Sequence, residues 1–182
     1  GGLTLCYVTS GHVTLNAMSP QFDLLKETRL VTMTSSSPLV FVVHADSPYK
    51  TLQDVVQAMR ASPGKLTYGS AGAGSAAHMA AVYLEDALSG VRAQHVPYKG
   101  LAAASADLIG GRIELLFDQI SAASQNARAG NVKALAVTTS TRSSLMPELP
   151  TMHEAGVTGY EAVTWFGMLG PANMPKDLAN KI

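Results

Sequence analysis

The chain has 182 residues, of which 47% are hydrophobic and only 14% charged, and its 13 basic and 13 acidic side chains cancel. This composition is typical of a folded globular protein of one medium domain or two small ones, and it excludes a disordered chain. Because the net charge is zero, nucleic-acid binding through charge alone is not expected. The low charge density favours a small ligand held by backbone and hydroxyl groups.

The two ends of the sequence both look cut. The chain starts at Gly1 without a methionine and stops at Ile182, in the first turns of an expected helix. No apolar run approaches the roughly 20 residues needed to span a bilayer. No signal peptide is present either, which is uninformative if the true N-terminus lies upstream.

Strand-like and helix-like segments alternate along the chain, which predicts an α/β fold with a largely parallel sheet. The expected strands cover residues 3–8, 30–33, 39–44, 65–69, 91–96, 113–117, 134–138 and 160–169, with a polar turn at residues 9–11. Six helices are expected. One begins at Thr51, one runs to Leu88, one ends at Gly110, one covers residues 121–129, and the last two begin at Thr151 and Pro175.

Two spacings predict helix starts, and two positions suit domain boundaries. Thr51 with Asp54, and Thr151 with Glu154, have the spacing of a capping box.

We expect residues 1–62 to form part of a first lobe, residues 63–139 a second lobe, and residues 140–182 a crossover back to the first lobe.

The most informative segment is a glycine-rich loop between an expected strand and an expected helix. The first N–H groups of a helix have no partner within it, and the helix dipole favours negative charge there. Small residues allow a ligand to approach the backbone, and serines add hydroxyl groups. The loop therefore predicts an anion site for a carboxylate or a phosphate. Its candidate residues are Ser70, Gly72, Ala73, Gly74 and Ser75. The alternative is a tight turn in which Ser75 only caps the helix.

The same loop fits a dinucleotide-binding pattern loosely, because Gly72, Gly74 and Ala77 read as G-x-G-x-x-A. That pattern needs an acidic residue at the end of the next strand, and residues 91–96 contain none. No Gly-Lys-Ser/Thr follows the loop, and no local spacing supports a catalytic triad. A nucleotide- or phosphate-binding α/β enzyme is therefore the alternative function, and we expect neither catalysis nor a cofactor.

Further candidate residues stand at other strand ends. Tyr98 and Asp118 would meet the loop at one edge of a parallel sheet. Asp118 either accepts a hydrogen bond from the ligand or caps the next helix. His78, about one turn into the helix after the loop, either faces the ligand or orders the loop, and His12 could do either. No histidine belongs to an H-E-x-x-H or H-x-H pattern, so we expect no metal site.

Several segments, read in order, resemble one known family. They are residues 66–70, 74–75 and His78, then 95–100, 108–111, 117–118, 134–138, 149–151, 154–156 and 165–167. Together they resemble the substrate-binding receptors of tripartite tricarboxylate transporters, also called Bug proteins. The resemblance covers nearly the whole chain.

The resemblance implies a periplasmic binding protein of type II, whose two αβ lobes are joined by two crossover strands and close on the ligand like a Venus flytrap. It implies a non-enzymatic solute receptor for di- or tricarboxylates, amino acids or aromatic acids, with membrane permease subunits as partners. Ser70, Gly72, Gly74 and Ser75 would then form the anion loop of the second lobe. Asp118 would sit on the facing rim with Tyr98 near it, and Ser10 and His12 would come from the first lobe.

The resemblance also implies that part of the protein is missing. Family members are longer, and they begin with a strand and a loop that supplies half of the carboxylate site. We therefore expect this chain to be a fragment with a complete second lobe and an incomplete first lobe. Exposed strand edges of the incomplete lobe would permit a homo-oligomer.

Overall fold

The computed structural model describes residues 4–18 and 23–182, which form two compact units. Unit 2 is Pro38–Val163, and unit 1 combines the described residues up to Ser37 with Thr164–Ile182. These limits differ from the predicted boundaries at residues 62 and 139, because the segments 38–62 and 140–163 pack with the central strands of unit 2. Residue 3 of the first expected strand lies outside the described residues.

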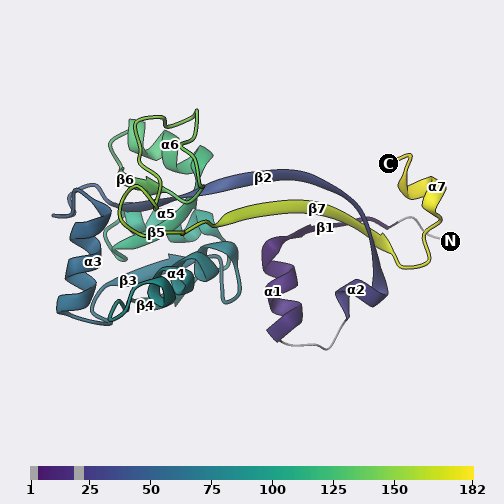
Figure 1. Cartoon of the computed structure of the whole chain (residues 1–182), viewed down its shortest axis with the longest axis horizontal. Helices are drawn as coiled ribbons and strands as arrows, with labels where there is room; N and C mark the ends of the chain where they lie inside the picture. The colour runs from purple at the N-terminus through teal and green to yellow at the C-terminus, as the bar shows by residue number, and fades with distance from the viewer. Residues whose placement is uncertain (1–3, 19–22) are drawn as a thin grey trace. The chain divides into compact units, whose positions relative to one another are not determined.

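Unit 2 is built on a mixed sheet (Figure 1). β5 (Leu115–Gln119) pairs in parallel with β3 (Thr67–Ser70), which pairs in parallel with β4 (Gln94–Pro97). The second part of β2 (Thr28–His44) runs antiparallel to both β5 and β6 (Val132–Val137). The α/β prediction is therefore confirmed, and the parallel pairing holds for β3, β4 and β5, which are joined by helical crossovers.

The strand β2 is continuous, although two strands separated by Pro38 were expected. Proline and the residue before it both favour extended backbone, so a proline can lie within a strand where one ladder donor is dispensable. The strand has residues in both units, as does β7 (Val163–Pro171). These are the two strands that pass from one unit to the other.

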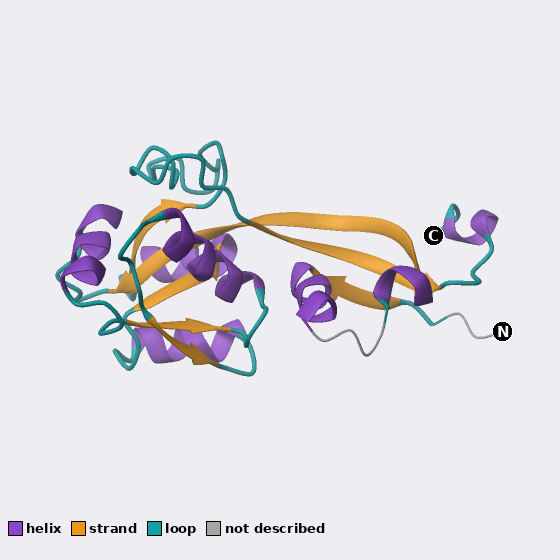
Figure 2. Cartoon of the chain, turned by 60° about the horizontal axis from the view of Figure 1, so that its bottom comes forward, coloured by secondary structure: helices purple, strands orange, loops and turns teal. Residues whose placement is uncertain are grey.

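Alternate residues of β2 enter two apolar clusters, one on each face of the sheet. Leu39, Phe41 and Val43 belong to the first cluster, and Val40 and Val42 belong to the second. Helices α3 (Leu52–Ala61) and α4 (Ala76–Ala87) contribute to the first cluster. Helices α5 (Leu101–Ile109) and α6 (Ile120–Arg128) contribute to the second, and Figure 2 shows the helices of unit 2 around its strands. Burial on both faces explains the unbroken apolar run at residues 39–43.

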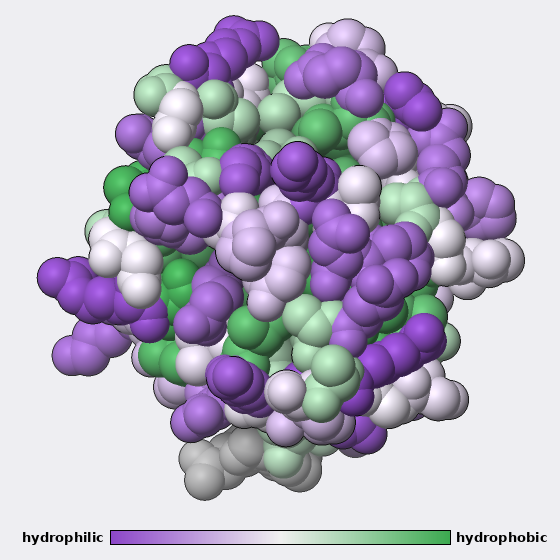
Figure 3. Space-filling view, turned by 90° about the vertical axis from the view of Figure 1, so that its left-hand side faces the viewer, coloured by the Kyte–Doolittle hydropathy of each residue, from purple (hydrophilic) through white to green (hydrophobic). Residues whose placement is uncertain are grey.

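The capping box at the start of α3 is confirmed. Thr51 Oγ1 accepts a hydrogen bond from the Asp54 N–H at 3.2 Å, and Asp54 Oδ2 accepts one from the Thr51 N–H at 2.9 Å. The helix buries one apolar face. Figure 3 looks onto the side of unit 2 on which α3 lies, where hydrophilic and apolar residues are interspersed at the surface.

We expect Thr51→Ala to lower the free energy of unfolding by about 1 kcal/mol, because the Asp54 N–H at the helix start loses its fixed acceptor. Urea unfolding followed by circular dichroism measures the change. Gln57→Ala, an exposed substitution on the same helix, is the control and should stay within about 0.5 kcal/mol of the unchanged protein. Equal effects of the two substitutions would contradict the role of the cap.

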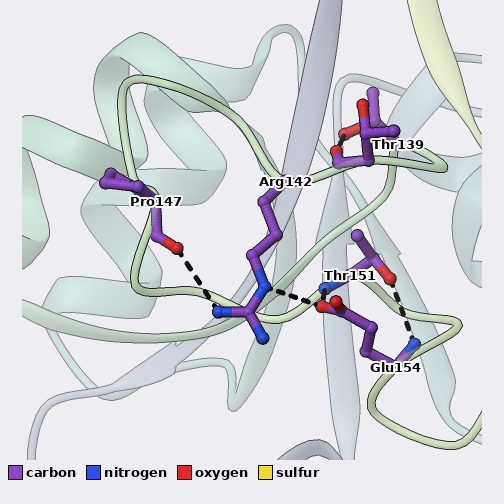
Figure 4. A network of polar contacts seen from close by, with 6 residues as sticks. Thr139, Arg142, Pro147, Thr151 and Glu154 are labelled. Carbon is purple, nitrogen blue, oxygen red and sulfur yellow. Dashed lines mark hydrogen bonds and ion pairs between the residues drawn. The ribbon is translucent and has the colours of Figure 1, made fainter.

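The second capping pair forms its hydrogen bonds, but no helix follows it. Thr151 Oγ1 accepts from the Glu154 N–H at 3.0 Å, and Glu154 Oε2 accepts from the Thr151 N–H at 2.9 Å and from Arg142 Nε at 2.8 Å (Figure 4). Gly156 follows with φ of 99°, which turns the chain out of a helical path. Thr151 instead bridges to Val137 of β6, and the rest of residues 139–162 form a loop.

Unit 1 contains β1 (Cys6–Thr9), which pairs antiparallel with β7. Helix α1 (Ser10–Met18) replaces the turn expected at residues 9–11, because nothing in that stretch prevents a helix from starting at Ser10. The short helices α2 (Leu24–Glu27) and α7 (Lys176–Ala179) complete the unit. Pro175, expected in the first turn of the last helix, is the N-cap residue of α7. Several large apolar side chains of this unit are exposed, among them Tyr7, Leu25, Leu30 and Met33.

Candidate functional site

The glycine-rich loop lies where predicted, between the end of β3 at Ser70 and the start of α4 at Ala76. We call residues 70–75 the anion loop. Gly72 has a φ of 111° and Gly74 a φ of 78°, values that residues with a Cβ rarely adopt. Ser75 is the N-cap of α4, and its Oγ accepts the N–H of His78 at 3.4 Å. Capping and an anion site are compatible here, because the cap engages the His78 N–H and not the N–H groups before it in the helix.

The N–H groups of the two glycines are used inside the protein. Gly72 donates to Ser70 Oγ at 3.0 Å, and Gly74 donates to Nδ1 of His78 at 3.1 Å. In the described part of the chain, no acceptor meets the N–H groups of Ala76 and Ala77, which form the first turn of α4. Donors for an anion are therefore available at the helix start rather than on the glycines.

Three aromatic rings lie behind the anion loop. The ring of His95 is 4.3 Å from that of His78 and 4.9 Å from that of Tyr68, between centroids, and Nε2 of His95 is 2.7 Å from Ser70 Oγ. Sequence reasoning named His78 but missed His95. The parallel pairing of β3 and β4 places His95 opposite Tyr68, so the strand register was the signal needed to find it.

Burial controls the protonation of this cluster. Burial lowers the pKa of His78, against an opposing effect of the Glu85 carboxylate, and lowers the pKa of His95, with a further lowering by His78. Burial also raises the pKa of Tyr68 to about 12. The two histidines and the tyrosine are therefore neutral near pH 7.

Asp118 lies at the same edge of the sheet as the anion loop. In the pairing of β3 with β5, Gly69 is opposite Leu116, so Asp118 is level with Ala71, two residues further along. Its side chain is 3% exposed, and its Oδ1 accepts the N–H of Gln119 at 2.8 Å. Helix α6 has Gln119 as its N-cap and no side-chain cap, so Asp118 does not cap it.

A cavity of about 480 Å3 opens beside Asp118, between α5 and α6. Its polar lining comes from Asp118, Gln119, Ser105 and Asn126, and the rest is Leu101, Ala102, Ala106, Ile109 and Ala122. Asn126 Nδ2 donates to Ser105 Oγ at 3.4 Å. Burial raises the pKa of Asp118, and hydrogen bonds from the Gln119 N–H and the Ser105 hydroxyl oppose the rise.

We expect Asp118→Asn to become more stabilising, relative to the unchanged protein, as the pH rises from 4 to 7. The pKa of Asp118 in the folded protein is above its ordinary value of 3.8, so the folded state binds this proton more tightly than the unfolded state. Its contribution to stability is complete below that ordinary value and is lost as the pH rises through the folded pKa. Thermal unfolding of both proteins across this range measures the difference. A difference that is constant with pH would contradict the prediction.

The other candidate residues are divided between the units. Tyr98 donates its hydroxyl to Asp107 Oδ2 of α5 at 2.8 Å, and its N–H donates to the Ser70 carbonyl at 3.0 Å. Its side chain is thus held against α5 while its backbone borders the anion loop. Ser10 and His12 lie in α1 of unit 1, where Nδ1 of His12 accepts the N–H of Thr9 at 3.1 Å. Unit 2 thus brings together the anion loop, His78, Tyr98 and Asp118 at one sheet edge.

Residues 4–18 and 23–182 contain neither a cluster of metal-binding side chains nor a helix that could span a membrane. No group of three or more His, Cys, Asp or Glu side chains there is placed to hold a metal ion. None of the helices in those ranges has both the length and the apolar character to cross a membrane.

The chain belongs to the tripartite tricarboxylate transporter family receptors, whose model matches residues 1–182. A UPF0065 protein from the tcbD–tcbE intergenic region of Pseudomonas sp. (strain P51) is 37% identical over 153 residues, which are 84% of this chain and 45% of the relative. The structure of R. palustris Rpa4515 with adipate is 31% identical, with a TM-score of 0.90 over 98% of this chain and 60% of that one.

The structure of the periplasmic binding protein BugD is also similar, at 30% identity and a TM-score of 0.87 over 97% of this chain and 60% of that one. The expected family and the type II binding-protein fold are therefore confirmed. The chain spans about half the length of the curated relatives it matches.

Proposed function

We propose that this chain is the ligand-binding part of a non-enzymatic solute receptor that captures a small organic carboxylate for a tripartite transporter. The observation that carries the proposal is the start of α4, where two N–H groups without acceptors follow a loop of small residues. A carboxylate is one of the anions that such donors and the helix dipole stabilise. Family membership and the adipate bound to the similar Rpa4515 support the same class of ligand.

In the proposed site, the ligand carboxylate lies at the start of α4. One carboxylate of the ligand accepts hydrogen bonds from the N–H groups of Ala76 and Ala77 and from the hydroxyl of Ser75. The small residues of the loop allow the ligand to approach the backbone. They are Ser70, Gly72, Ala73 and Gly74. Asp118 and the backbone of Tyr98 border the site at the same sheet edge of unit 2.

Family membership supports the proposed setting. The similar protein BugD is a periplasmic binding protein, and this receptor works in the same compartment, where it passes its ligand to permease subunits in the membrane. The site has no acidic residue on β4 to bind a ribose and no lysine after the loop to bind phosphates. A nucleotide ligand is therefore disfavoured.

A thermal-shift screen with mono-, di- and tricarboxylates, ATP and NAD tests the proposal. A ligand that binds only the folded state at 100 times its Kd stabilises that state by about 2.7 kcal/mol. We expect one class of carboxylate to raise the unfolding midpoint and the nucleotides to leave it unchanged. A shift with a nucleotide, or no shift with any carboxylate, would contradict the proposed function.

A further inference from the structure

Two histidines connect to different parts of the anion loop. Nδ1 of His78 accepts the N–H of Gly74 at 3.1 Å. Nε2 of His95 is 2.7 Å from Ser70 Oγ, and that oxygen accepts the N–H of Gly72 at 3.0 Å. The centroids of the two imidazole rings are 4.3 Å apart. Both glycines of the loop are therefore tied, directly or through one serine, to a single pair of contacting rings.

The contact with Gly74 depends on the protonation state of His78. Nδ1 accepts a hydrogen bond only while it carries a lone pair, so the ring must be neutral with its proton on Nε2. Protonation would place an N–H on Nδ1 opposite the N–H of Gly74, and the hydrogen bond would be lost. Two imidazolium rings at the distance of this pair would also repel each other.

The groups that face the pair leave it neutral near pH 7. Tyr68 of β3 stacks on both rings and stays protonated, since its pKa is raised to about 12. Glu85 of α4 favours the charged form of His78, but its Oε1 accepts the N–H of Ala93 at 2.8 Å and its Oε2 is 3.8 Å from Arg92 Nη1. Burial outweighs Glu85 and keeps the pKa of His78 below its ordinary value of 6.5.

We propose that His78 and His95 are positioning residues for the ligand: the neutral pair holds the anion loop in its binding geometry, and protonation in mild acid releases the loop and weakens carboxylate binding. The identity of the ligand class rests on the proposed function, whereas the state of the loop does not. The competing effect has the opposite sign, because an imidazolium beside the loop would attract a carboxylate and strengthen binding in acid. The direction of the pH dependence therefore separates the two.

The test compares adipate binding by calorimetry at pH 7.5 and pH 5.0 in three proteins. His78→Asn keeps an acceptor oxygen close to the position of Nδ1 and does not titrate. His153→Asn is the matched control, because Nδ1 of His153 accepts the N–H of Gly159 at 3.1 Å in an exposed turn of the same unit. Titration of adipate itself affects all three proteins alike and cancels in the comparison.

We expect the unchanged protein and His153→Asn to lose affinity together, by up to about tenfold for each pH unit below the pKa of His78. Whatever its affinity at pH 7.5, His78→Asn should lose at least threefold less affinity on acidification than the unchanged protein. Affinity that rises in acid, or a fall in His78→Asn as steep as in the unchanged protein, would overturn the inference.

Nitrogen NMR of the imidazoles in the unchanged protein tests the loop without a variant or a ligand. We expect His78 to carry its proton on Nε2 at pH 7.5, and the amide signal of Gly74 to shift with the same pKa as His78. A proton on Nδ1, or a Gly74 signal that does not follow His78, would overturn the inference. If no carboxylate binds at either pH, the proposed function fails, and this measurement still decides the role of the pair.

Discussion

Phe117→Ala is expected to lower the free energy of unfolding by about 3–5 kcal/mol. The Phe117 side chain is 1% exposed, and its ring lies 4.8 Å from that of Phe41 and 6.4 Å from that of Tyr160, between centroids. Removing the ring leaves a cavity between β2, β5 and the segment that follows β6, and the surrounding strands can close it only in part. The loss is large against the 5–15 kcal/mol by which most domains are stable.

Urea unfolding at 25 °C measures this effect, with two controls. Phe117→Leu keeps most of the buried volume and should cost less than about 1.5 kcal/mol. Leu145→Ala removes an apolar side chain that is 52% exposed and should change stability by less than about 0.5 kcal/mol. A loss below about 1 kcal/mol for Phe117→Ala would show that β5 is not held in the core as described.

Gly74→Val is expected to reduce carboxylate affinity at least tenfold. Gly74 has a φ of 78°, and a β-branched side chain strains such a backbone by about 1–3 kcal/mol. The loop relieves this strain by changing its path, which moves the N–H groups at the start of α4 and breaks the contact with His78. Calorimetry with the carboxylate that gives the largest thermal shift measures the loss.

Gly64→Val is the matched control for this substitution. Gly64 has a φ of 75° in the turn after α3, and an added Cβ there would meet no atom within 4 Å. The two variants should lose similar stability from backbone strain, whereas only Gly74→Val should lose affinity. Equal affinities of the two variants would contradict the placement of the ligand at the anion loop.

Local patterns in the sequence predicted much of unit 2. The capping box at Thr51 and the run of small residues before α4 depend on contacts within a few residues, so their outcome is visible in the sequence. The apolar run at residues 39–43 indicated a strand buried on both faces. The order of motifs also indicated the family, which the match over residues 1–182 confirms.

The misses occurred where local signals are weak or misleading. Pro38 suggested a break, but an extended strand tolerates a proline, so β2 runs through it. Thr151 and Glu154 form their reciprocal hydrogen bonds without a helix, because Thr151 bridges to β6 and Gly156 turns the chain. Thr9 and Ser10, at the start of α1, suit a turn as well as a helix start, so residue types alone did not separate the two.

The sequence by itself determined the α/β class, the position of the anion loop and the family, because each depends on residue types at short spacing. Only the tertiary structure decided which side chains meet across strands. The contact between His95 and Ser70 requires the parallel register of β3 and β4. The position of Asp118 beside the loop requires the register of β3 and β5. Strand register is set by packing between segments distant in the chain, and short-range patterns carry little information about it.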